Sequence, residues 1–302
     1  MANAIELFKQ YIPMLDEVYK MASLTSKLDG NPELVQQGAN ANELIIPMIE
    51  MDGLADYERN GGYVSGNVTL TNQTKKCNFD RGRKFTVDAL DNVESAMLAF
   101  GRLASEFIRT KVVPELDAFR LSTYASTAGV GTGNGTITTG KQAVEALRAG
   151  LKKMDDDEVP YEDRHLYATS KIIGLIKDMD TTASKEVMEE FASVTKIPSS
   201  RLVTKIKQLN GKTTGEEKGG YKKADDAQDI DFEIIHRPAL VQFGKRNVNK
   251  IFTPEQNQDS DGWIMVYRDV NIAEVYKNKL AGIYVHTPTA ITPAEDQGGI
   301  RR

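Results

Sequence analysis

The sequence predicts a mixed α+β protein with an outstretched amino-terminal part and a compact carboxyl-terminal part. Three observations carry this prediction: a polar stretch at 22–43, two β-type runs around a glycine-rich loop within 43–79, and a helical period over 91–119. From residue 139 onward the chain alternates short helical and strand patterns, which indicates an α/β unit. Its 302 residues correspond to about two domains of roughly 150 residues.

Residues 1–42 are expected to form an arm. Apolar residues three and four apart over 4–19 predict a short helix that Pro13 kinks or ends. The following stretch, 22–43, has only four large apolar residues among Gly, Asn, Gln, Ser and Pro. Such a segment cannot bury a core of its own, so we expect it to lie on another surface.

A long β-hairpin is predicted next. Residues 43–51 and 68–79 are typical of strands, and the 15 residues of 52–66 between them include four glycines. Pro47 cannot donate a ladder hydrogen bond, which favours an edge position for the first strand. An isolated two-stranded ribbon is only marginally stable in water, so we expect this hairpin to have a partner.

A long helix and an α/β unit follow. The helix over 91–119 would be about 45 Å long, with a bend at Pro114 and a glycine-rich turn at 128–135. The α/β unit and the closing part contain the following predicted elements: helices 141–154 and 170–179, strands 165–169, 201–208 and 230–236, an exposed loop at 210–228, and closing strands 263–267, 272–276 and 280–286.

Composition and charge exclude several classes of protein. With 38 basic and 43 acidic residues the net charge is -5, which argues against a protein that coats DNA by overall charge. The single cysteine, Cys77, excludes an intramolecular disulfide framework and a thiolate zinc cluster. We find no secretory signal pattern and no apolar run near the ~20 residues that cross a bilayer, so we expect an intracellular protein without a membrane segment.

Two segments resemble known ligand-binding loops but lack a residue that each loop needs to bind its ligand. Residues 135–142 nearly match the G-x-x-x-x-G-K-[ST] phosphate loop, but Gln142 has no hydroxyl for Mg²⁺ and a glycine-rich turn precedes the loop. Residues 257–262 begin like a calcium loop, but the twelfth position is Arg268, where a bidentate glutamate is required. We interpret the first as a linker entering a helix and the second as a polar turn.

No constellation of residues predicts catalysis or a cofactor. His165, His236 and His286 are far apart in the chain and stand beside apolar residues. We therefore expect no enzyme, no cofactor and no metal. An α/β nucleotide-binding enzyme is an alternative from another class, and it would require residues 135–142 to bind nucleotide.

The basic cluster Arg81-Gly82-Arg83-Lys84 is the best candidate for binding a charged partner. It stands between Phe79 and Phe85, and nearby aspartates dilute its charge. We expect it to contact acidic residues of a neighbouring subunit, with DNA as the weaker alternative.

The order of these elements resembles that of the tailed-phage major capsid proteins, which have the Hong Kong 97-like fold. Four local sequences are also similar to phage capsid sequence: Ala39-Asn40-Ala41-Asn42-Glu43, Cys77-Asn78-Phe79-Asp80-Arg81-Gly82-Arg83, residues 107–115 (FIRTKVVPE) and residues 278–284 (NKLAGIY). The resemblance covers nearly the whole chain. It implies an N-arm at 1–42, an E-loop hairpin at 43–80, a P-domain with a spine helix at 81–138, an A-domain at 139–252, and P-domain closing strands with a tail at 253–302.

The resemblance implies a structural protein. Hexamers and pentamers of the chain would tile an icosahedral shell around double-stranded DNA, without sequence-specific binding, in a virion assembled in the host cytoplasm. The implied partners are other copies, a separately encoded scaffolding protein and a portal, and a decoration protein is a further candidate. The alternative within the same fold is the shell of an encapsulin-like compartment, which holds no genome.

Two departures from the family pattern shape these expectations. Some members cross-link through an E-loop lysine, but residues 52–74 contain no lysine, so we expect no covalent chainmail. The arm begins almost at once, without a fused scaffold, and this is why a separate scaffold is expected. The candidate contacts between subunits are charged residues at the hairpin tip, at its base and on the long helix: Asp52, Asp56, Glu58, Arg59, Arg81, Arg83, Glu94 and Arg102.

Overall fold

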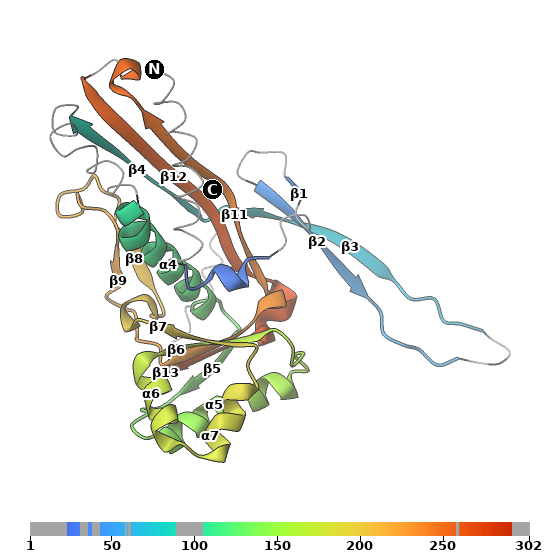
Figure 1. Cartoon of the computed structure of the whole chain (residues 1–302). Coiled ribbons are helices and arrows are strands. Elements are labelled where there is room, and N and C mark those ends of the chain that lie inside the picture. Colours follow the sequence, from blue (N-terminus) through green and yellow to red (C-terminus); the bar gives the residue numbers. More distant parts are fainter. Residues whose placement is uncertain are drawn as a thin grey trace.

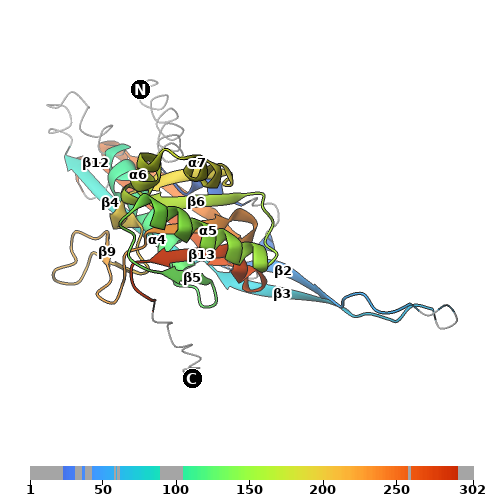
Figure 2. The same ribbon diagram turned by 90° about the horizontal axis from the view of Figure 1, so that it is seen from below.

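The computed structural model describes residues 23–30, 36–37, 43–57, 59, 62–88, 105–257 and 260–291. A sheet of long strands forms one end of the body, and a second sheet with its covering helices forms the other (Figure 1). A hairpin extends away from this body in both views (Figures 1 and 2). Within the described ranges, no helix combines the length and apolar character needed to cross a bilayer.

The predicted hairpin is present. Strands β2 (Glu43–Met51) and β3 (Val68–Lys76) pair antiparallel, with Met51 opposite Val68. The short strand β1 (Gln36–Gln37) pairs with β2 at residues 44–45 only. Strand β2 is thus the middle strand of this sheet, and the prediction of an edge strand is wrong for it. Pro47 itself lies beyond the stretch paired with β1 and pairs with β3 only. Proline is compatible with this position because it lacks the N–H group that a second neighbouring strand would require.

A long three-stranded sheet has the order β11-β12-β4. It consists of β4 (Phe79–Asp88), β11 (Leu240–Phe252) and β12 (Gly262–Val275), all antiparallel. The basic cluster therefore lies on a sheet strand and not at the end of the hairpin. Residues 240–252, which the sequence groups with the α/β unit, pair in this long sheet, and the two predicted strands within 263–276 are one continuous strand.

The described part of the predicted long helix runs from Ser105 to Ala125. It contains a π-helical turn at Ile108–Val112, followed by α4 (Val113–Ala125). Pro114 does not end the helix, which continues through it to Ala125. In a regular α-helix its ring would clash with the carbonyl four residues earlier, and the wider π turn just before it relieves this clash. The earlier part of the predicted helix, 91–104, lies outside the described residues, as does the predicted helix at 4–19.

A five-stranded sheet has the order β5-β13-β10-β6-β7. Its strands are β5 (Gly131–Asn134), β13 (Ile283–Thr287), β10 (Phe232–His236), β6 (Arg164–Thr169) and β7 (Ser193–Ile197). One face packs against α5 (Gly140–Asp156), α6 (Ser170–Met179) and α7 (Thr182–Glu189). The other face packs against α4, whose Leu121 and Tyr124 also reach Leu240 of the long sheet. Helix α4 thus joins the two ends of the body.

Three local predictions in this unit need correction. The glycine-rich turn at 128–135 contains strand β5, which pairs parallel with β13. A Cβ at Gly133 would collide with the ring of Tyr284, so glycine leaves room for that ring. Helix α7 and strand β7 were not predicted. The strand expected at 201–208 is reduced to β8 (Ile206–Gln208), which pairs with β9 (Tyr221–Lys223) inside the stretch predicted as loop.

Candidate functional site

The hairpin loop carries an exposed apolar surface. Of the eight large hydrophobic side chains that are exposed among the described residues, seven lie in the hairpin: Met51, Leu54, Tyr57, Tyr63, Val64, Val68 and Leu70. The rings of Tyr57 and Tyr63 lie 4.9 Å apart between centroids. Single exposed apolar residues are ordinary, whereas a group of them on a projecting element marks an interaction surface.

The charged residues predicted at the hairpin tip have different surroundings. The backbone N–H of Asn67 donates to Asp52 Oδ2 at 2.7 Å, and the N–H of Asp52 donates to the carbonyl of Asn67 at 3.1 Å. Asp52 therefore closes the neck of the loop. Asp56 and Arg59 are exposed, and Glu58 lies outside the described residues.

The sequence-based prediction of contact residues in the loop considered only charged side chains and missed the apolar ones. Their signal is present in the sequence: Leu54, Tyr57, Tyr63 and Val64 interrupt a loop that otherwise contains glycine and polar residues. A solvated loop rarely requires two tyrosines and two aliphatic side chains. The loop composition alone thus indicates a surface that another surface covers.

A groove of about 1260 Å³ lies between β4, the helix ahead of α4 and the β8–β9 loop. Aromatic side chains line one part of it, with Phe85 and Phe107 at 4.7 Å and Phe107 and Tyr267 at 5.8 Å between ring centroids. Its other lining is charged and contains the following bases and acids: Arg81, Arg83, Lys111, Lys218, Lys222 and Lys223, with Glu106, Glu115, Glu217, Asp229 and Asp269. Figures 1 and 2 both place the β8–β9 loop on the side of the body opposite the hairpin.

Arg81 and Arg83 hold this groove together within one subunit. Arg81 Nε lies 2.7 Å from a carboxylate oxygen of Glu115, and its guanidinium donates to the carbonyls of Leu209 and Gly220 at 2.8 and 3.2 Å. Arg83 donates to the carbonyl of Glu217 at 3.0 Å. Burial raises the pKa of Glu115, and Arg81 opposes that rise without cancelling it. The intersubunit role of these arginines stays a prediction, and Glu94 and Arg102 lie outside the described residues.

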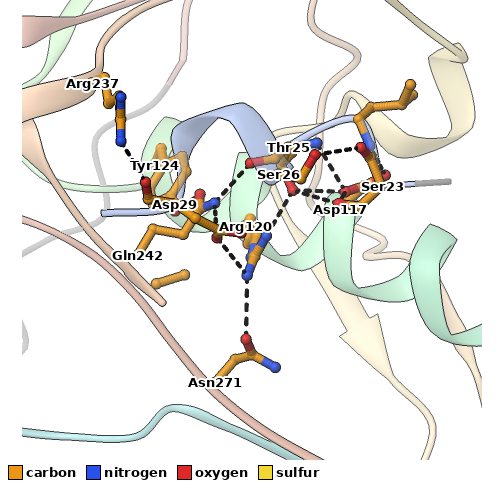
Figure 3. Close-up of polar contacts among 12 residues, drawn as sticks. Ser23, Thr25, Ser26, Asp29, Asp117, Arg120, Tyr124, Arg237, Gln242 and Asn271 are labelled. Carbon is orange, nitrogen blue, oxygen red and sulfur yellow. Dashed lines mark hydrogen bonds and ion pairs between the residues drawn. The ribbon is translucent and has the colours of Figure 1, made fainter. Parts of the chain in front are cut away.

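Part of the predicted arm, residues 23–30, lies on the chain's own body, in contrast to the expectation that the arm needs another surface. We call this segment the strap. It crosses α4 and is held by polar contacts (Figure 3). Asp117 of α4, which is fully buried, accepts hydrogen bonds from Thr25 Oγ1 at 2.7 Å and from Ser23 Oγ at 3.0 Å. The backbone N–H of Leu24 donates to its second oxygen at 3.1 Å.

Further contacts tie the strap to both ends of the body (Figure 3). Gln242 of β11 donates through Nε2 to the carbonyl of Thr25 and to Asp29 Oδ1, both at 2.8 Å. Arg120 of α4 donates to Thr25 Oγ1 at 3.0 Å and pairs with Asp29 at 3.2 Å. Leu28 is buried in the cluster that contains Tyr124 and Leu240. Segments lacking enough apolar residues for a core can therefore still bind their own subunit through hydrogen bonds.

In the phosphate-loop-like sequence at 135–142, backbone N–H groups donate hydrogen bonds to a side chain of the same segment. Gln142 Oε1 accepts from the backbone N–H groups of Thr138 and Thr139 at 2.9 and 3.1 Å, and Thr139 and Gln142 form a capping box at the start of α5. A side-chain amide therefore already occupies two of the backbone N–H groups at this helix start, which a phosphate would have to replace. Among the described residues, no group of three or more His, Cys, Asp or Glu side chains could hold a metal ion.

Comparisons with known proteins agree on the fold. No protein-family model and no curated protein sequence matches the chain. Among solved structures, a virus-like particle from Pyrococcus furiosus is similar at a TM-score of 0.58 and 10% identity, covering 93% of this chain and 99% of that one. The capsid of Staphylococcus phage Andhra is similar at 0.56 and 10% identity, covering 86% and 84% of the two chains. The capsid of Cyanophage P-SCSP1u is similar at 0.52 and 13% identity, covering 85% and 86%. The chain therefore has the fold of phage capsid proteins, a fold that this virus-like particle shares.

Proposed function

We propose that this chain is the major capsid protein of a tailed double-stranded DNA phage and that its copies form the hexamers and pentamers of an icosahedral shell around the genome. The observation that carries the proposal is the projecting hairpin, whose apolar loop is left uncovered by its own subunit. The fold shared with phage capsids supports the same conclusion. On this proposal the protein is structural and non-enzymatic, and it acts with a separately encoded scaffold and a portal.

The proposed division of the chain follows the observed sheets. The long sheet and the helix that ends in α4 correspond to the P-domain and spine helix, the five-stranded unit to the A-domain, and the β2–β3 hairpin to the E-loop. The strap belongs to the N-arm. Strand β11 joins the P-domain part, which moves the end of the proposed A-domain from residue 252 to about 239. Strands β5 and β13, which the sequence groups with the P-domain segments, pair in the five-stranded sheet and join the proposed A-domain.

The hairpin and the groove lie on opposite sides of the body, and this arrangement suits a head-to-tail contact. A contact between two different surfaces closes into a ring when the rotation between copies is right. The exposed tyrosine pair of the tip can pack on the aromatic side chains of the groove. The negative charge of Asp56 is complementary to the positive charges of the exposed Lys218 and Lys222. We place the tip of one copy on the groove of the next. Each contact can stay weak because many act together in a shell.

Charge reversal across this contact tests it. We expect Asp56→Lys to raise the protein concentration needed for assembly by about fivefold, since an exposed charge pair contributes up to about 1 kcal/mol. Lys222→Glu should have a similar effect, and the double variant should recover assembly. Light scattering against protein concentration measures the threshold. Two single variants that assemble as the wild type does would contradict the contact.

The second candidate function is the shell of an encapsulin-like compartment. The similarity to the virus-like particle from Pyrococcus furiosus supports this candidate. The two functions differ in what the shell holds. Negative-stain microscopy of the expressed chain, with and without a candidate scaffold, should show closed shells, and nuclease-protected DNA inside particles from infected cells supports the phage proposal. An enzyme cargo in place of DNA would establish the compartment. A chain that remains monomeric under every condition would overturn both.

A further inference from the structure

A buried carboxyl group lies under the strap. Glu233 is fully buried in β10, opposite Tyr167 of β6 and Val285 of β13. These two neighbours belong to the same apolar cluster as Leu28 of the strap and Tyr124 of α4. The side chain of Glu233 therefore lies on the sheet face that α4 and the strap cover.

Glu233 has no hydrogen-bond partner at either carboxylate oxygen within the described part of the chain. An ionised carboxylate that is buried without donors is costly, so this site holds the protonated form. Burial accordingly raises the pKa of Glu233 well above its ordinary value. The chain thus carries a buried acid whose two charge states require different surroundings.

The hydroxyl groups near this carboxyl are engaged in holding the strap and its support. Tyr124 donates to Gln242 Oε1 at 2.6 Å, and Gln242 in turn donates to the strap. Tyr167 donates to the carbonyl of Leu24 in the strap at 3.4 Å. Tyr167 is the cross-strand neighbour of Glu233, and Tyr124 packs in the same cluster as Tyr167. Burial raises the pKa of both tyrosines. An ionised Glu233 would compete with the strap for these donors.

We propose that residues 23–30 are a releasable strap, closed while Glu233 carries its proton and opened when Glu233 gives that proton to water and accepts hydrogen bonds from Tyr124 and Tyr167. The closed state connects the long sheet, α4 and the five-stranded sheet through one segment, so its release removes these polar connections and leaves α4 as the link between the two ends of the body. The proposal concerns the isolated subunit and does not depend on the assembly proposed above.

Other ionisable groups surround the same junction. They are His165 and Tyr167 on β6, Asp117, Arg120 and Tyr124 on α4, Lys27 and Asp29 on the strap, and Asp269 on β12. Burial raises the pKa of Asp269 to about 6, an effect that Arg120 opposes, whereas burial lowers the pKa of His165. Strand β13 contributes Val285, which does not titrate. Asp269 and His165 are therefore the groups whose titration must be separated from that of Glu233.

Hydrogen exchange of the full chain between pH 5 and 8 tests the proposal. The closed strap binds one more proton than the open strap above the ordinary carboxyl pKa. After correction for intrinsic exchange rates, the opening constant of the peptide covering 23–30 should therefore rise by about tenfold per pH unit. Peptides from α5 should show no such rise, which distinguishes strap release from global unfolding.

Four variants make the test decisive. Glu233→Gln, or Glu233→Met if the first does not fold, should give a flat profile with the strap closed throughout. Asp269→Asn and His165→Gln should each keep the wild-type slope. Glu145→Gln on the exposed face of α5 serves as a matched control. A flat wild-type profile, an unchanged slope in Glu233→Gln, or a slope lost in Asp269→Asn or His165→Gln would each overturn the proposal.

Discussion

Deletion of residues 54–64 is expected to leave a folded, monodisperse subunit that forms no shells. The deletion removes Leu54, Tyr57, Tyr63 and Val64 and joins Gly53 to Ser65. It keeps the hydrogen bonds between Asp52 and Asn67 that close the neck of the loop. Because these four side chains are exposed, their removal takes little buried apolar surface from the body. Electron microscopy counts the shells, and circular dichroism checks the fold.

Point variants separate the apolar surface from the mere length of the loop. Replacing Tyr57 and Tyr63 together by serine should abolish or strongly weaken assembly, since aromatic anchors dominate protein interfaces. Tyr161→Ser is the matched control, because Tyr161 is 73% exposed, between Tyr57 at 60% and Tyr63 at 90%, but lies on the body. Normal shells from the deletion variant would show that the hairpin is not an assembly element.

The second large effect is expected at Asp117. Asp117→Ala should lower the free energy of unfolding by about 3–5 kcal/mol, because it leaves buried donors of the strap without an acceptor. It also removes the ion pair with Arg201, whose guanidinium lies 3.4 Å from Asp117 Oδ2. Urea unfolding of the unassembled subunit measures the change, and hydrogen exchange should show the strap released.

An exposed ion pair supplies the control for this variant. Glu106 and Arg109 lie 2.7 Å apart on the helix, and both side chains are more than half exposed. Glu106→Ala should therefore cost no more than about 1 kcal/mol. If Asp117→Ala were as mild as Glu106→Ala, the strap would not be fixed by its polar contacts.

Local patterns predicted those elements whose stabilising partners are close in the sequence. The hairpin strands appear with their predicted starts at residues 43 and 68, and helices α5 and α6 lie within one or two residues of their expected bounds. In each case the alternation or the helical period is complete within one segment. At the hairpin tip the prediction named only the charged residues as contacts between subunits, which stays a prediction, and it overlooked the exposed apolar residues between them.

The candidate site was only partly predictable for the same reason. Arg81 was singled out because of its charge, but its partners Glu115, Leu209 and Gly220 lie up to 139 positions away in the chain. No local pattern can show such a partner. The charged tip residues and Arg81 are named by the sequence, whereas the groove that Arg81 helps to build exists only in the folded chain.

By itself, the sequence determined the strands of the hairpin, the helical character of the described residues 105–119, and helices α5 and α6 of the α/β unit, because each depends on periodicity over neighbouring residues. Only the tertiary structure decided that β4, β11 and β12 form one sheet, that a glycine-rich turn contains strand β5, and that the strap binds its own subunit. The physical reason is the same in all three cases. These features are stabilised by pairing and hydrogen bonding between segments far apart in the chain, and such contacts leave no periodic trace in either segment alone.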